Sequence, residues 1–135
     1  MSEKEQPSFD MVQMVANYME EGLLDNIVSM FKADKTSYSL IGELITDERV
    51  RVRLGVTALV EILAEEDPDN LPLAGPSLMK ALKNEFPTYR GDAVNLLGIM
   101  KYKDALPLLR ELTQDKEESV RQMAREAIND IMENN

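Results

Sequence analysis

DERVRVRLGVTALVEIL, residues 47–63, decides the fold, because two later stretches align with it without a gap. They are NEFPTYRGDAVNLLGIM, residues 84–100, and DKEESVRQMAREAINDI, residues 115–131. The three copies start 37 and then 31 residues apart. A period of this size is typical of stacked helical hairpins, in which each hairpin buries its apolar side against its neighbours.

Each copy opens with a short polar residue and carries an arginine six residues later. The polar residues are Asp47, Asn84 and Asp115, and the arginines are Arg53, Arg90 and Arg121. An Asp or Asn at a helix start can accept hydrogen bonds from the free N–H groups there. The three copies therefore predict three second helices that start behind equivalent turns.

The rest of the chain divides around these copies. We expect a flexible tail over residues 1–8 and a single repeat domain over residues 9–135. Apolar spacing predicts a divergent hairpin over 9–33 and then repeats over about 36–64, 70–100 and 103–133. The predicted fold class is all-α, a solenoid of about eight helices.

The first helix of each repeat is predicted over 37–45, 70–83 and 104–113. Proline occurs at equivalent places in two of them, as Pro76 and Pro107. Pro107 falls in a first turn, where its missing N–H has no partner within the helix. Pro76 lies deeper in its predicted helix, so we expect a kink there.

Composition excludes several classes of function. The chain has no cysteine and no histidine, so it can form no disulfide, Cys/His zinc site or His-based catalytic triad. Its formal net charge of −10 repels nucleic-acid phosphates and anionic lipids. With no apolar run of membrane-span length and no signal-peptide pattern at Met1–Asp10, we expect a cytoplasmic protein.

The pattern of Asp, then Val-Arg, then small and aliphatic residues resembles HEAT repeats, especially the short HEAT-like units of phycobilisome lyases. The residues that carry the resemblance are Asp47, Val52, Arg53, Val56, Leu59 and Val60, and then Asp115, Val120, Arg121, Ala124, Ala127 and Ile128. The middle copy departs from it with Asn84 and Tyr89. The resemblance implies a right-handed superhelix of the HEAT-like or armadillo type, with a concave face lined by second helices. It also implies arginines that bond the turn aspartates as a structural ladder.

The function that this architecture favours is non-catalytic: a scaffold or adaptor that binds another protein, with no cofactor and no metal. Residues on second helices that the core does not require are the candidates for contact with that partner. They are Arg49, Thr57, Glu61, Asp92, Asn95, Arg125 and Asn129. The resemblance leaves open a second function, as a subunit or chaperone of a chromophore lyase-like enzyme. Nucleic-acid binding is disfavoured by charge, and membrane association is not expected.

An apolar stripe on one second helix has two interpretations. Leu54, Ala58 and Ile62 lie four residues apart, and the last copy has Gln122, Glu126 and Asp130 in their places. We expect the N-terminal hairpin to cover the apolar stripe, and the polar one to face water as a terminal repeat requires. The alternative is an exposed groove for a partner helix.

Three other features have both a binding and a structural interpretation. Arg49, Arg51 and Arg53 could bind an acidic group, but a solvated helix end is the favoured interpretation. The acidic linker, residues 65–70, could contact a cation, but it lacks the spacing and the glycine of a calcium loop, so a solvated loop is the favoured interpretation. Met11 and Met14 leave open a homodimer through the N-terminal hairpin.

Overall fold

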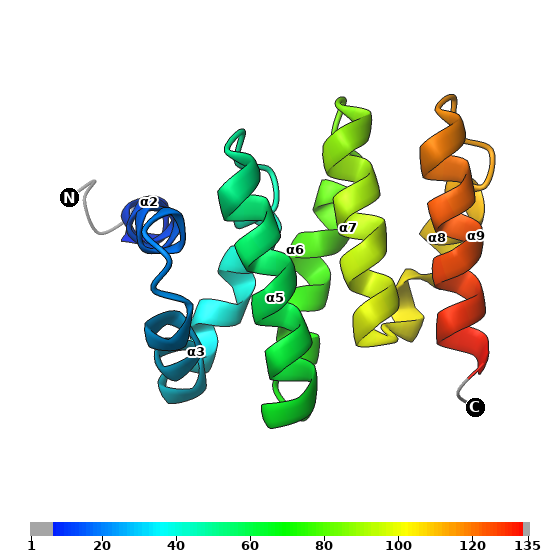
Figure 1. The fold of residues 1–135 in the computed structure, drawn as a ribbon. Helices are drawn as coiled ribbons and strands as arrows, with labels where there is room; N and C mark the ends of the chain where they lie inside the picture. The colour runs from blue at the N-terminus through cyan, green and yellow to red at the C-terminus, as the bar shows by residue number, and fades with distance from the viewer. Residues whose placement is uncertain (1–6, 134–135) are drawn as a thin grey trace.

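The computed structural model describes residues 7–133, and these form an all-α solenoid (Figure 1). Within that range eight α-helices follow one another: α2 Pro7–Glu20, α3 Leu24–Ala33, α4 Ile41–Leu44, α5 Val50–Glu66, α6 Gly75–Ala81, α7 Pro87–Met100, α8 Leu106–Leu112 and α9 Glu118–Glu133. Three 3₁₀ segments lie between them: η1 Lys35–Leu40, η2 Leu71–Ala74 and η3 Lys103–Ala105. Most of the predicted tail lies outside the described residues, and α2 begins at Pro7.

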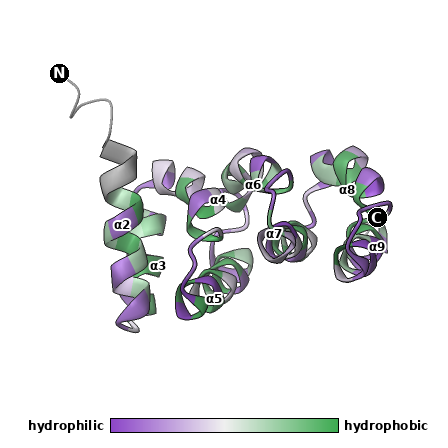
Figure 2. Cartoon of the chain, turned by 90° about the horizontal axis from the view of Figure 1, so that it is seen from above, coloured by the Kyte–Doolittle hydropathy of each residue, from purple (hydrophilic) through white to green (hydrophobic). Residues whose placement is uncertain are grey.

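The later helices stand in two layers. Seen from above, α4, α6 and α8 form one row and α5, α7 and α9 the other (Figure 2). The helix α2 is seen end-on in Figure 1, where α5, α7 and α9 run upright, so the first hairpin is turned relative to the units that follow.

The core lies between the layers and follows the repeat. Positions that align across the copies are buried in each of them: Val56, Ala93 and Ala124, then Leu59, Leu96 and Ala127. The first apolar position of the pattern is buried as Val52 and Val120 and half-buried as Tyr89. Helical spacing of apolar residues thus forms one continuous core.

Each first helix opens with a 3₁₀ turn instead of running as one α-helix. Proline explains this in two units, because its ring excludes the carbonyl four residues earlier and it donates no N–H. The turn before Pro76 closes with a bond from the Gly75 N–H to the Pro72 carbonyl, and that before Pro107 with a bond from Leu106 to Lys103. Pro76 therefore lies in the first turn of α6, and the predicted kink within a longer helix is wrong.

Two glycines permit close helix crossings. A Cβ on Gly42 would lie 2.3 Å from the Ser77 backbone oxygen, where α4 crosses α6. A Cβ on Gly55 would lie 2.3 Å from Met19 Cγ, where α2 crosses α5. The side of α5 that meets the N-terminal hairpin is thus the side of Gly55.

Candidate partner-binding face and arginine ladder

The three repeat arginines make the same bond within their own units. Nη1 of Arg53, Arg90 and Arg121 donates to the backbone carbonyl of Asp47, Asn84 and Asp115, at 2.8, 2.9 and 2.7 Å. Each arginine is therefore held against the turn that precedes its helix. This part of the ladder does not need a turn carboxylate, so it survives the change to Asn84.

The turn side chains support the same turns. Asp47 Oδ1 accepts from the Arg49 N–H, Asn84 Oδ1 from the Phe86 N–H and Asp115 Oδ1 from the Glu117 N–H, each at 2.9 Å. These N–H groups belong to the residue just before each second helix. As predicted, the turn side chains accept hydrogen bonds from backbone N–H groups. Each donor is the residue two positions later in the chain, so the bond closes the turn.

The strongest rung joins the second and third units. Arg90 Nε and Nη2 donate to the two carboxylate oxygens of Asp115, both at 2.9 Å. The side chains are 8% and 7% exposed, so the pair is almost dry. Burial acts to raise the pKa of Asp115, but hydrogen bonds from Arg90 and from the Glu117 N–H outweigh it and lower that pKa.

The rung between the first and second units uses another residue. Because Asn84 carries no charge, Arg53 Nε donates instead to Asp92 Oδ2, at 3.0 Å. Its guanidinium also lies over the Tyr89 ring, 5.4 Å from the centroid. Desolvation raises the pKa of Asp92 more than Arg53 lowers it. This rung is thus electrostatically weaker than the one at Asp115.

Two of the predicted partner-binding residues take part in ion pairs within the chain. One is Asp92, which belongs to the ladder. The other is Arg49, whose Nε and Nη2 donate to Asp47 and whose Nη1 donates to Asn17, at 3.1 Å. Hydrogen bonds from Arg49 lower the pKa of Asp47.

The other five predicted residues are spread over three helices. Thr57 is half-buried and donates to the Arg53 carbonyl. Glu61, Asn95, Arg125 and Asn129 are exposed. Among residues 11–133, no hydrogen bond or ion pair joins these five side chains to one another, so they outline a face instead of forming one compact site.

The apolar stripe on α5 is not covered as expected. Leu54 is 66% exposed, whereas Ala58 and Ile62 are half-buried. The N-terminal hairpin contacts the side of α5 that carries Arg51 and Gly55. There Met19 packs on Gly55, and Arg51 Nε donates to the Glu20 carbonyl at 2.9 Å. The expectation that the hairpin covers Leu54 is therefore wrong.

The polar stripe on α9 is exposed to water as expected, but it does not form the outer end of the described array. Glu126 and Asp130 line a small hollow together with Asn95 and Gly98, so they face α7. The outer end of the described array is formed by a different side of α9.

The acidic linker is tied to the first half of the chain. Asp67 accepts from the Tyr38 hydroxyl and from Asn70 Nδ2, and Glu66 accepts from Lys32 Nζ at 2.8 Å. Burial and the Asp67 carboxylate raise the pKa of Tyr38. Glu66 and Asp67 thus hold part of the linker against the first half of the chain, whereas the sequence favoured a solvated loop.

A face of exposed side chains runs along the three second helices, on the side away from the core; we call it the second-helix face. Its exposed members are Val50, Leu54 and Glu61 on α5, Asn95 on α7, and Gln122 and Asn129 on α9. In Figure 1 these helices lie in front of α6 and α8. Glycine replaces Leu54 and Glu61 on α7, as Gly91 and Gly98, so the face is lower in its middle.

A hollow of about 310 Å³ lies in that lower part, between the starts of α7 and α9. Its lining includes Thr88, Gly91, Asp92, Glu117 and Met123. Its lining is therefore part apolar, from Gly91 and Met123, and part acidic, from Asp92 and Glu117, and it comes from α7, α9 and the turn before α9.

Two exposed apolar residues were not among the predicted contacts. Val50 is 58% exposed and Phe86 is 55% exposed, with Phe86 packed edge-on against Tyr89. The aligned copies contain a signal for Phe86, because Arg49 and Glu117 occupy its place in the other units. Val50 is matched by Pro87 and Glu118, so it too differs from copy to copy.

The comparisons with known proteins agree with this architecture. Residues 75–135 match the family model of HEAT repeats, and no curated protein matches the chain. The match does not single out the phycobilisome lyase type. HEAT repeats commonly serve as protein-interaction scaffolds and are typically non-enzymatic. No helix in residues 7–133 has the length and apolar character needed to cross a membrane. Residues 75–135 are thus HEAT repeats by the family match, and the solenoid and the repeated arginine bonds continue the same HEAT-like architecture through α5.

Proposed function

We propose that the protein is a non-catalytic scaffold that binds another protein across the second-helix face. The observation that carries the proposal is the exposure of Val50 and Leu54, at 58% and 66%, one helical turn apart on α5. The fold gains nothing from aliphatic side chains there. A partner that buried them would gain about 1.5–3 kcal/mol for each.

The shape of the face supports the same proposal. The hollow over Gly91 lies on α7, the helix that follows α5 in the row, so a partner helix that crossed both would meet the apolar ridge of Leu54 and then a depression. Glu61 and Asn95 lie nearby on the exposed surface and would form a polar rim. Sites of this form favour a protein partner over a small molecule.

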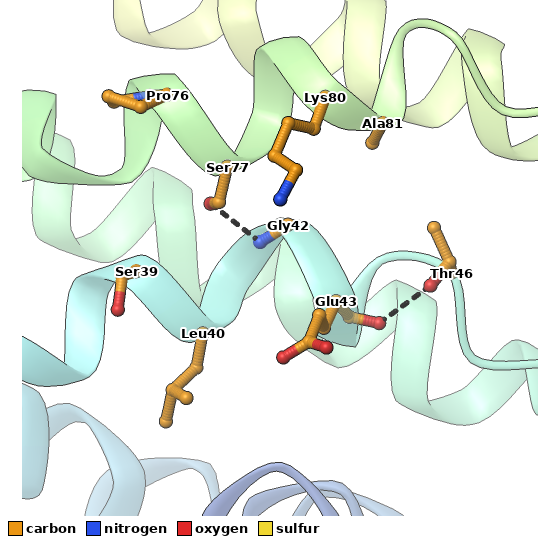
Figure 3. A pocket seen from close by; sticks show the side chains of 9 residues that line it. All are labelled: Ser39, Leu40, Gly42, Glu43, Thr46, Pro76, Ser77, Lys80 and Ala81. Atoms are coloured by element: carbon orange, nitrogen blue, oxygen red, sulfur yellow. Dashed lines mark hydrogen bonds between the residues drawn. The ribbon is translucent and has the colours of Figure 1, made fainter. Parts of the chain in front are cut away.

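The chromophore alternative has less support. The hollow of about 520 Å³ between α4 and α6 lies in the first-helix layer (Figure 3). Ser39, Ser77, Glu43 and Lys80 contribute to its lining, and it opens to solvent. A tetrapyrrole would need an enclosed apolar pocket, and this open groove, with Glu43 and Lys80 in its lining, does not favour one.

The test is affinity capture from the native cell extract with the wild-type chain and the variant Leu54→Asp. We expect the variant to lose a partner, because a carboxylate would have to be desolvated in the contact. The matched control is Leu73→Asp, which changes an exposed leucine of the other layer, 48% exposed. Circular dichroism checks that both variants fold. Identical partner sets for Leu54→Asp and the wild type would contradict the proposal.

A further inference from the structure

Arg121 is the last arginine of the ladder. It binds the turn of its own unit, but among the described residues no carboxylate of a further unit binds it. Arg121 Nη1 donates to the Asp115 carbonyl at 2.7 Å, the same bond that Arg53 and Arg90 make to their own turns. Those two arginines then use the rest of the guanidinium to bind a carboxylate on the next unit. Among residues 11–133, no carboxylate lies within 4.0 Å of the Arg121 guanidinium in an ion pair.

The inner bond places Arg121 for such a contact. Arg90, which makes the equivalent bond, presents Nε and Nη2 together to Asp115. A guanidinium held by one edge has lost part of its rotamer freedom already, so a carboxylate can bind the other edge at a smaller entropic cost. The ladder thus specifies both the ligand group and its direction.

Other cations lie on the same outer side. On α9, Arg125 and Ile128 follow Arg121 at helical spacing, on the side away from α7. On α8, Arg110 aligns with Gly42, which faces the next unit at Ser77. We call Arg110, Arg121 and Arg125 the arginine end. Three arginines on one side are notable in a chain with a formal net charge of −10.

We propose that the arginine end is a second docking surface, for an acidic helical protein that presents an aspartate at the start of a helix. That aspartate would bind Arg121 as Asp115 binds Arg90, while Arg110 and Arg125 would attract further acidic groups. Two copies of this chain meeting through this surface would bring arginine against arginine. Charge therefore favours a different protein over a symmetric dimer.

The chain itself supplies a probe of known chemistry, the hairpin that carries Asp115. Met100 aligns with Ile131, so a second copy of residues 101–131 inserted between Ile131 and Met132 keeps the repeat in register. The copied aspartate then faces Arg121. We expect the enlarged chain to unfold in one transition with a higher midpoint than the natural chain, because stacked repeats stabilise their neighbours.

The decisive variant is Asp→Asn at the copied aspartate only, which leaves every natural residue unchanged. We expect it to lower the midpoint by about 4 °C or more. Arg121→Lys, which keeps the charge but not the two-pronged geometry, should reproduce most of this loss in the enlarged chain and little of it in the natural one. Separate melting of the insert, or no effect of the copied Asp→Asn change, would overturn the proposal.

Two further measurements identify the occupant. Sedimentation of the natural chain should show no association that Arg121→Glu abolishes, since such an association would assign the surface to a second copy. In the capture experiment, a partner of the arginine end should be lost by Arg121→Glu and retained by Leu54→Asp. The two docking proposals can therefore fail separately.

Discussion

At the scale of single residues, the ladder shows how one substitution is compensated elsewhere. Asn84 stands where the other copies have aspartate, and it keeps both its turn bond and its carbonyl contact with Arg90. Asn84 has no charge, so it cannot form an ion pair with Arg53. The negative charge beside Arg53 comes from Asp92, one turn into α7, while Tyr89 covers the guanidinium.

The two ladder carboxylates should differ in what they contribute to stability. Asp115→Asn leaves the nearly dry guanidinium of Arg90 without its counter-ion, so we expect the free energy of unfolding to fall by about 3 kcal/mol. Asp92→Asn should cost less than about 1 kcal/mol, because burying the Asp92 carboxylate already offsets much of its attraction to Arg53. Urea unfolding at pH 7, followed by circular dichroism, measures both. Equal losses in the two variants would contradict this ranking.

At the scale of elements, close crossings decide where helices touch. The helix α4 is only four residues long, and its Gly42 N–H donates to Ser77 Oγ at 3.0 Å (Figure 3). Such a short helix has little stability of its own. Its place therefore depends on contact with α6, which a side chain at residue 42 would prevent.

Gly42→Ala should be strongly destabilising although alanine is the better helix former. The new Cβ would meet the Ser77 backbone, which cannot move without shifting α6, so we expect a loss of about 2 kcal/mol. The matched control is Gly91→Ala, whose Cβ would lie 3.1 Å from Met123 Sδ, the flexible part of a side chain. That change should be neutral or slightly stabilising. Thermal unfolding of both variants gives the comparison, and a tolerated Gly42→Ala would refute the close crossing.

At the scale of the whole molecule, the ladder links stability to pH. In the folded chain the pKa values of Asp47 and Asp115 are lowered below 3.8, the ordinary value of an aspartate. Their contribution is present above that value and is lost as pH falls through the lower, folded pKa. Asp92 acts in the opposite sense, because its raised pKa removes stability as pH rises through the interval above 3.8.

We therefore expect the free energy of unfolding to fall as pH drops below about 4. Asp115→Asn should flatten this decline, and Asp92→Asn should not. Urea titrations at pH 7, 5 and 3 provide the measurement. A decline of the same steepness in Asp115→Asn and the wild type would show that the acid dependence has another origin.

The candidate surfaces could be predicted only in part. The ladder positions follow from the alignment of the three copies, since equivalent residues in stacked hairpins meet equivalent surroundings. Among the seven predicted contacts, Arg49 and Asp92 are ion-paired inside the chain, because the alignment does not show which helix face meets the next helix. Because the alignment does not show how the helices are oriented, Leu54 was also expected to be covered by the N-terminal hairpin.

The amino-acid sequence by itself determined the class of fold, the register of the three copies and the turn residues that begin each second helix. These depend on spacing and on contacts within about six residues, which the order of residues specifies. Only the tertiary structure decided that Arg53 bonds Asp92, that Gly55 and not Leu54 lies under the hairpin, and that Arg121 lies on the side of α9 away from α7. Each of these depends on how one helix is rotated against another. That rotation is set by the packing of the whole array, which local spacing does not contain.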